Sequence, residues 1–293
     1  MKNDDQPVGR VLSRREALAL MGAAGAAVLA ACAPGQSGTG QPTGEPTQAP
    51  SSVPTLSPSS LPTQASPLAT AVTSPSCVVR PEMTEGPYFV DEQLNRSDIR
   101  SEPSDGSVKE GVPLALVFLV SQVTGNACSP LAGATVDVWH CDAQGIYSGV
   151  SDQALGFDTV GQKFLRGYQV TDENGVARFS TIFPGWYTGR TVHIHFKIRT
   201  TTASNQSYEF TSQLYVDDAL TDQVHAQEPY AGKGRRDTTN DTDMHYQNGG
   251  DQMLLALAEA NGGYIATFDI GLDLSDTDTG QPDSFQQPGG GPP

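Results

Sequence analysis

The segment that most constrains the fold is His193-Ile-His-Phe-Lys-Ile198, in which polar and apolar residues alternate. Side chains of an extended strand point to opposite faces in turn, so residues two apart lie roughly 6.5–7 Å apart on one face. The pattern predicts a strand with one face on a hydrophobic core and with His193 and His195 together on the other. Two imidazoles placed in this way can bind one metal ion, although an isolated pair is also compatible with ordinary strand structure.

Two tyrosines and an arginine lie where they could join the histidine pair. Tyr187 and Arg190 follow a turn marked by Pro184 and Gly185, a few residues before the strand. Tyr147 comes after another strand candidate and a glycine-containing turn. Taken singly, either tyrosine could be an aromatic residue at the rim of the fold, so their interpretation depends on the wider pattern.

The composition restricts the possible partners. The 293-residue chain carries a net charge of −16, and beyond its first residues the one basic cluster is Lys233-Gly-Arg-Arg236. Nucleic-acid binding depends on neutralising phosphates with basic residues, so we expect no nucleic-acid partner. The acidic surface is most simply explained by solubility.

Residues 1–32 have the features of an export signal. A twin arginine, Arg14-Arg15, precedes an uncharged run from Ala17 to Ala31, which is too short for a transmembrane helix of ~20 residues. The run ends in Leu29-Ala-Ala-Cys32, which resembles a bacterial lipobox, so we expect a lipid on Cys32. An uncleaved signal anchor is the alternative. The protein is thus expected on the outer face of the cell membrane, or secreted, with membrane contact only through this lipid.

The remaining chain divides by composition. Residues 33–76 are rich in Pro, Ser and Thr and lack aromatic residues, so they cannot bury enough apolar surface to fold and we expect a disordered tether. Residues 276–293 are similar and are expected to form a disordered tail. One domain remains, from residue 77 to 275.

Three cysteines belong to this domain, and an odd number leaves at most one disulfide and one free thiol. Cys128 and Cys141 flank a predicted strand and would lie far apart along it. A bond from Cys77 to either of them is therefore favoured, and the pairing stays open.

The domain pattern is that of a mostly β protein, an antiparallel β-sandwich with few short helices. Asn174-Gly175 is the strongest hairpin signal, and we predict a short helix over 251–260. The predicted strands cover residues 113–120, 134–140, 163–170, 176–182, 193–198, 208–216 and 264–270.

Five motifs together resemble the intradiol ring-cleavage dioxygenases, the family of catechol and protocatechuate dioxygenases. These motifs are Thr84-Glu-Gly-Pro-Tyr88, Val136 to Tyr147 with Trp139 inside it, Pro184-Gly-Trp-Tyr187, Arg190 with His193-Ile-His-Phe196, and Thr211-Ser-Gln-Leu-Tyr215. The leader, the tether and the three cysteines are similar to the exported branch of that family.

The resemblance implies a ferric ion held by Tyr147, Tyr187, His193 and His195. Ferric iron is a hard ion, for which phenolate oxygen and imidazole nitrogen are suitable donors. It further implies that Tyr187 dissociates and accepts a substrate proton, that Arg190 stabilises negative charge and that Gln213 positions the substrate or a peroxide. The expected reaction cleaves the ring of a catechol-type substrate with O2 to give a muconate-type diacid.

Substrate choice and oligomeric state stay open. Only five residues separate Tyr187 from His193, fewer than in cytoplasmic relatives, which predicts a more open pocket. The substrate could be catechol, hydroxyquinol, protocatechuate or an aromatic compound released from plant polymers.

Two other functions compete with this prediction. A sandwich that has lost its chemistry would serve as a surface binding module, but it should lack at least one of the four ligands. A zinc or copper enzyme or a cupin could also use a His-x-His pair, yet no glutamate follows His195 at cupin spacing. The other histidines are assigned lesser roles: His140 as structural or as a support for the site, His225 and His245 as solvated loop residues.

Overall fold

The computed structural model describes residues 78–276. The predicted signal and tether, all but the first residue of the predicted tail, and Cys77 lie outside this range. None of the helices between residues 78 and 276 combines the length and the hydrophobicity needed to cross a bilayer.

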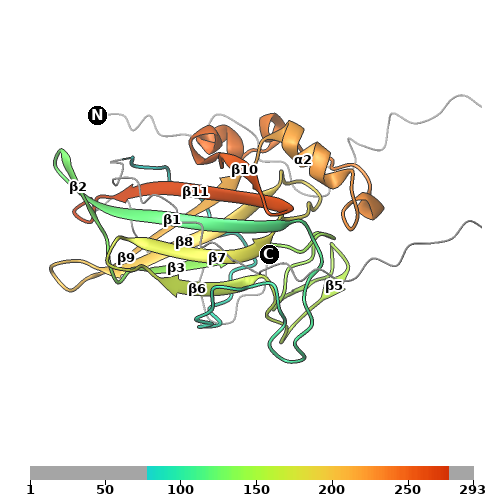
Figure 1. The fold of residues 1–293 in the computed structure, drawn as a ribbon, viewed down its shortest axis with the longest axis horizontal. Coiled ribbons are helices and arrows are strands. Elements are labelled where there is room, and N and C mark those ends of the chain that lie inside the picture. The colour runs from blue at the N-terminus through green and yellow to red at the C-terminus, as the bar shows by residue number, and fades with distance from the viewer. Residues whose placement is uncertain (1–77, 277–293) are drawn as a thin grey trace, which may run out of the picture. The chain divides into compact units, whose positions relative to one another are not determined.

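Two β-sheets packed face to face form the domain, as the alternating sequence patterns predicted (Figure 1). The first sheet contains β10 (Leu257–Ala260), β11 (Gly263–Leu272), β1 (Pro113–Thr124) and β2 (Ala127–Pro130) in this order, and β7 (Val176–Ile182) pairs with β1. The second contains β6 (Arg166–Val170), β3 (Thr135–Trp139), β8 (His193–Thr201) and β9 (Ser207–Tyr215). A separate small ribbon pairs β4 (Ser151–Asp152) with β5 (Phe157–Asp158). The mostly β sandwich is confirmed, with one parallel pair, β1 and β11, among antiparallel neighbours.

Helices are few and short, as expected. The α-helix α2 spans Asp218–His225 and is capped at its N-terminus by Asp217, whose side chain accepts hydrogen bonds from the backbone N–H groups of Ala219 and Leu220. Single 3-10 turns follow it: η1 (Ala231–Lys233), η2 (Asn240–Thr242), η3 (Tyr246–Asn248) and η4 (Gly250–Met253).

The helix predicted over 251–260 is wrong. Only η4 is helical there, and residues from Leu257 onward form strand β10. Asn261 and Gly262 both have positive φ angles, 50° and 78°, and join β10 to β11 as a tight hairpin. Pairing with the long strand β11 therefore overrides the helical preference of Leu257-Ala-Glu-Ala260.

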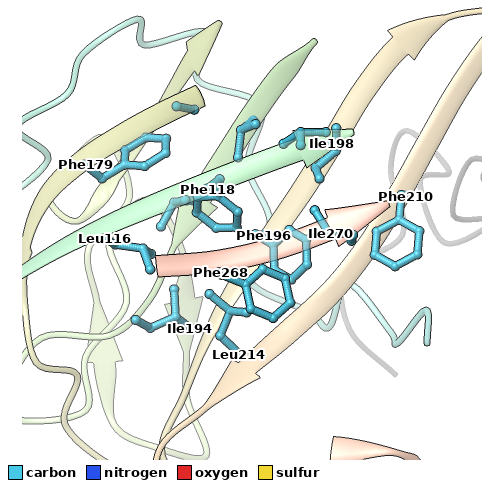
Figure 2. Packing of buried hydrophobic residues seen from close by; sticks show 14 of the residues in the cluster. Leu116, Phe118, Phe179, Ile194, Phe196, Ile198, Phe210, Leu214, Phe268 and Ile270 are labelled. Atoms are coloured by element: carbon cyan, nitrogen blue, oxygen red, sulfur yellow. The ribbon is translucent and has the colours of Figure 1, made fainter. Parts of the chain in front are cut away.

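The core lies between the sheets and is made of their alternating apolar residues (Figure 2). Ile194, Phe196 and Ile198 of β8 are fully buried. The ring of Phe196 lies 5.3 Å from that of Phe118 on β1 and 5.6 Å from that of Phe268 on β11. The inner face of β8 thus anchors the strand at the centre of the sandwich, and its outer face is left for other side chains.

His140 and His225 are both structural residues. His140 is fully buried at the end of β3, and its imidazole bonds to the carbonyl of Cys141 at 2.8 Å and to Thr181 Oγ1 at 2.7 Å. The prediction of a solvated His225 is wrong. Its Nε2 donates to the carbonyl of Pro184 at 3.0 Å and its ring stacks on Tyr230, which ties α2 to the turn that precedes Tyr187.

The cysteines agree with the spacing argument. Cys128 is disulfide-bonded, whereas Cys141 is a buried free thiol, so the two do not pair with each other. Burial raises the pKa of the Cys141 thiol to about 12, which keeps it protonated and unreactive. The predicted role of Cys77 lies outside the described residues.

The position of Phe118 between the two sheets yields a stability prediction. Phe118→Ala removes a ring that contacts three other core phenylalanines and should lower the free energy of unfolding by about 3–5 kcal/mol. Urea denaturation followed by fluorescence measures this change. The control Val160→Ala alters a side chain that is 69% exposed and should stay within about 0.5 kcal/mol of the parent. Equal effects of the two substitutions would contradict the described core.

Candidate metal centre

The outer face of β8 carries His193 and His195, opposite the core face. The two Nε2 atoms lie 3.0 Å apart, and the side chains are only 2% and 1% exposed. His193 Nδ1 donates to the carbonyl of Thr191 at 2.6 Å, which leaves the Nε2 lone pair free. A backbone bond of this kind is the usual device that orients a metal-binding imidazole.

Both predicted tyrosines reach the same point. The hydroxyl oxygens of Tyr147 and Tyr187 lie 3.5 Å and 3.2 Å from His193 Nε2. Tyr147 is fully buried and Tyr187 is 8% exposed. The structure therefore brings two phenol oxygens and two imidazole nitrogens from separate parts of the chain to one buried position.

Two glycines allow the tyrosine loops to meet. A Cβ on Gly185 would overlap the carbonyl oxygens of Asp142 and Ala143, and a Cβ on Gly145 would overlap the carbonyl of Trp186. Gly145 also has a φ of +77°, a conformation suited to glycine. The loops before Tyr147 and Tyr187 thus touch backbone to backbone, which sets the distance between the two rings.

Aromatic rings and a third segment enclose the cluster. Trp139 stacks on His195 with centroids 5.0 Å apart, and Tyr88 stacks on Tyr147 at 4.5 Å. A Cβ on Gly86 would come within 3.2 Å of the His195 ring. The Thr84–Tyr88 motif therefore closes one side of the site. The hydroxyl group of Tyr88 donates to Asp152 rather than to the cluster.

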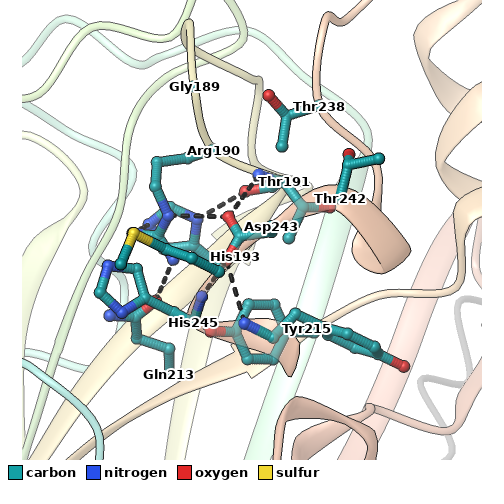
Figure 3. A network of polar contacts seen from close by, with 12 residues as sticks. Gly189, Arg190, Thr191, His193, Gln213, Tyr215, Thr238, Thr242, Asp243 and His245 are labelled. Atoms are coloured by element: carbon teal, nitrogen blue, oxygen red, sulfur yellow. Dashed lines mark hydrogen bonds and ion pairs between the residues drawn. The ribbon is translucent and has the colours of Figure 1, made fainter. Parts of the chain in front are cut away.

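Arg190 and Gln213 also lie where the sequence placed them, beside the cluster (Figure 3). Arg190 Nη2 donates to Gln213 Oε1 at 2.5 Å, and Nη1 lies 3.4 Å from His193 Nε2. Gln213 stands directly across from His195 in the β8–β9 ladder. Asp243, which forms an ion pair with Arg190 at 2.8 Å, was not predicted, because no local pattern in its loop distinguishes it.

His245 was predicted as a solvated loop residue, but it is partly buried and lies beside Arg190 (Figure 3). Burial and then the positive charge of Arg190 lower its pKa, so its imidazole is neutral near pH 7.

The electrostatics of the four converging groups fit a bound cation. Burial raises the pKa of Tyr147 and raises that of Tyr187 to about 12, and it lowers the pKa values of His193 and His195. A bound cation would lower the pKa of both phenols, because it stabilises their phenolate forms. Within residues 78–276 no group of three His, Cys, Asp or Glu side chains could hold a metal, whereas the two tyrosines add two oxygens to the two imidazoles here. This donor set suits a hard ion such as Fe(III) and does not match a zinc or cupin site.

A family model described as dioxygenase matches residues 84–254, more than half of the chain. The chain therefore belongs to the intradiol dioxygenase family. Its fold agrees: an intradiol ring-cleavage dioxygenase from Tetranychus urticae superposes with a TM-score of 0.58 at 29% identity, over 68% of this chain and 96% of that structure.

Curated relatives match over shorter stretches. Chlorocatechol 1,2-dioxygenase of Pseudomonas putida is 29% identical over 155 residues, which are 46% of this chain and 55% of that protein. Catechol 1,2-dioxygenase of Acinetobacter baylyi is 33% identical over 110 residues, 36% of this chain and 32% of that protein. The chain thus spans about half or less of the length of these relatives.

The contact between the tyrosine loops generates a prediction. Gly185→Ala forces the loop before Tyr187 away from Asp142 and, if the cluster holds a metal, should reduce the metal bound per chain at least several-fold, measured by elemental analysis after incubation with Fe(III). Gly232→Ala is the matched control, because its Cβ would meet only Glu228 Oε2 at 3.9 Å. Full iron content in Gly185→Ala would show that the spacing of the loops does not set the site.

Proposed function

We propose that this protein is a non-haem Fe(III) intradiol dioxygenase that cleaves a catechol-type ring with O2 to a muconate-type diacid. The observation that carries the proposal is the convergence of Tyr147, Tyr187 and His195 on His193 Nε2, all within 3.5 Å. Family membership supports it, since the related proteins are catechol and chlorocatechol 1,2-dioxygenases.

The four side chains would hold the ion through two phenolate oxygens and two imidazole nitrogens. When bound, Fe(III) supplies Lewis-acid chemistry towards the two hydroxyl oxygens of a catechol. The bond between the two hydroxyl-bearing carbons breaks, and both atoms of O2 enter the product.

Tyr187 is suited to accept a proton from the substrate. Its pKa is raised to about 12 by burial, so its phenolate, once released, is a stronger base than a tyrosinate in water. It is also the more accessible of the two tyrosines, 8% exposed against 0% for Tyr147. The Tyr187 oxygen is therefore the group that would accept a proton from a catechol hydroxyl.

Arg190 and Gln213 act on the organic substrate. The guanidinium of Arg190 is only 14% exposed and faces the His193 nitrogen, so its charge is poorly screened by water. A fixed cation at this position stabilises negative charge that develops on the substrate. Gln213, bonded to the carbonyl of Thr84 at 2.9 Å, fixes the other end of the guanidinium and the side of the pocket next to it.

Oxygen uptake with product identification tests the activity. The iron-loaded protein should consume one O2 per catechol and give a ring-opened diacid, and removal of iron with a chelator should abolish uptake. A screen of hydroxylated and carboxylated catechols would then define the substrate. Absence of uptake with every catechol, in protein that contains iron, would favour the binding module.

Colour tests the ligand set. Tyrosinate bound to Fe(III) absorbs visible light, so Tyr147→Phe should remove about half of this absorption and shift its maximum. Tyr168→Phe, which changes a tyrosine on β6 that is not part of the site, should leave the spectrum intact. An unchanged spectrum of Tyr147→Phe would exclude Tyr147 from the ligands.

The proposed location is the outer face of the cell membrane, through a lipid on Cys32, and the Leu29-Ala-Ala-Cys32 pattern supports it. Cys32→Ser should move the protein from the membrane fraction to the soluble fraction of a bacterial host, whereas Ala33→Ser should not. Cell fractionation with immunoblotting measures this. Retention of Cys32→Ser at the membrane would exclude this anchor.

A further inference from the structure

We propose that Asp243 is a positioning residue that orients Arg190 towards the reacting centre and balances its charge there. The inference rests on the proposed function and adds a residue that lies far from the family motifs in the sequence. It concerns how the protein holds the positively charged Arg190 side chain next to the proposed metal ion.

Both carboxylate oxygens of Asp243 accept hydrogen bonds from neighbouring residues. It is 1% exposed, and Oδ2 accepts Arg190 Nε at 2.8 Å and the Thr191 amide at 2.9 Å. Its Oδ1 accepts the amides of His245 and Tyr246 at 2.8 Å and 3.0 Å. Four donors therefore fix both oxygens, so this carboxylate offers Arg190 a rigid partner (Figure 3).

Each nitrogen of the Arg190 guanidinium has a different task. Nε is held by Asp243, and Nη2 is held by Gln213 at 2.5 Å. Nη1 is left to face His193 Nε2 at 3.4 Å. Two bonds thus orient the plane of the group, and the third nitrogen presents its N–H groups to the position where the metal ligands converge.

Charge gives Asp243 a second task. A trivalent ion held by two phenolates would keep one net positive charge, and it would strongly repel a second cation nearby where water is excluded. A buried, unpaired guanidinium would also lose its hydration without compensation. The carboxylate of Asp243 offsets both effects, so Arg190 can stay in place before the substrate brings its own negative charge.

Two other residues of the Asp243 loop also bond to the segment that carries Arg190. Asp237 Oδ1 accepts the amide of Gly189 at 3.1 Å, and Asn240 Oδ1 accepts Thr191 Oγ1 at 2.7 Å. These bonds hold the segment when Asp243 is changed. Substitution of Asp243 should therefore act on Arg190 and leave the loop in place.

The test is a double-mutant cycle with Asp243→Asn and Arg190→Gln in the iron-loaded full chain. Asp243→Asn should lower kcat for catechol about 10- to 100-fold and keep the visible spectrum of the resting protein. In the Arg190→Gln background the same change should lower kcat less than about threefold, because the residue acts through Arg190. Asp137→Asn is the matched control, since Asp137 is a buried carboxylate paired with Arg199 at 2.8 Å, and it should leave kcat unchanged.

A second readout does not depend on turnover. Binding of 4-nitrocatechol without O2 reports the ionisation of the bound catechol through its own colour, and Asp243→Asn should weaken this binding at least threefold with the resting spectrum intact. Should Asp243→Asn not fold, Asp243→Glu decides the matter, because it keeps the charge and displaces the carboxylate. A lowered kcat with an unchanged resting spectrum supports the proposal, and a wild-type kcat overturns it.

The two proposals fail in different ways. Iron-loaded wild-type protein without ring cleavage overturns the proposed function. Active wild-type protein with a fully active Asp243→Asn variant overturns only the role of Asp243. A loss that is equally large with and without Arg190 overturns it too, because it would show that Asp243 acts on the fold rather than on Arg190.

Discussion

The alternation of β8 is the constraint on which the rest of the structure depends. One face of the strand enters the core through Ile194, Phe196 and Ile198, and the other carries His193 and His195. A shift of one residue in register would move the imidazoles into the core and the apolar residues into the site. The hydrophobic packing between the sheets therefore also fixes the position of the two histidines, and pairing with β3 and β9 on both sides adds to their rigidity.

Burial of the four donor groups sets a second constraint, which links the site to a cation. Polar groups removed from water destabilise a fold unless they are bonded, and here the oxygens of Tyr147 and Tyr187 and the Nε2 atom of His195 all lie within 3.5 Å of His193 Nε2. The surrounding charges follow the same logic. Arg190 is neutralised by Asp243, and the buried Lys197, two residues after His195 on the same face, pairs with Glu85 at 2.5 Å. Arg190 and Lys197 are thus each matched by a carboxylate, which leaves the two phenols available to neutralise the ion that we propose.

Sequence reasoning succeeded where the pattern is local and failed where partners come from a distance. The alternation of β8 and the glycine turns before Tyr147 and Tyr187 are visible in short windows, and the family motifs placed Arg190 and Gln213. The parallel pairing of β1 with β11 is not visible, since it joins the first and last strands of the sandwich. The Asn261-Gly262 turn was a hairpin signal that the helical composition of the preceding residues obscured. Asp243 has no local signal, because its importance arises only from the contact with Arg190, 53 residues earlier.

The four proposed ligands differ in how firmly the surrounding structure holds them. His193 and His195 belong to a central strand, and the loop of Tyr147 is pinned because Thr159 Oγ1 donates to its carbonyl at 2.6 Å. Tyr187, in contrast, precedes the exposed residues Thr188 and Gly189 and is the more exposed of the two tyrosines. A ligand can leave an ion only if its own backbone or side chain can move without disrupting the core. This difference favours Tyr187 over Tyr147 as the group that yields its place to the substrate, and it places the movable ligand next to Arg190, the residue suited to receive the new negative charge.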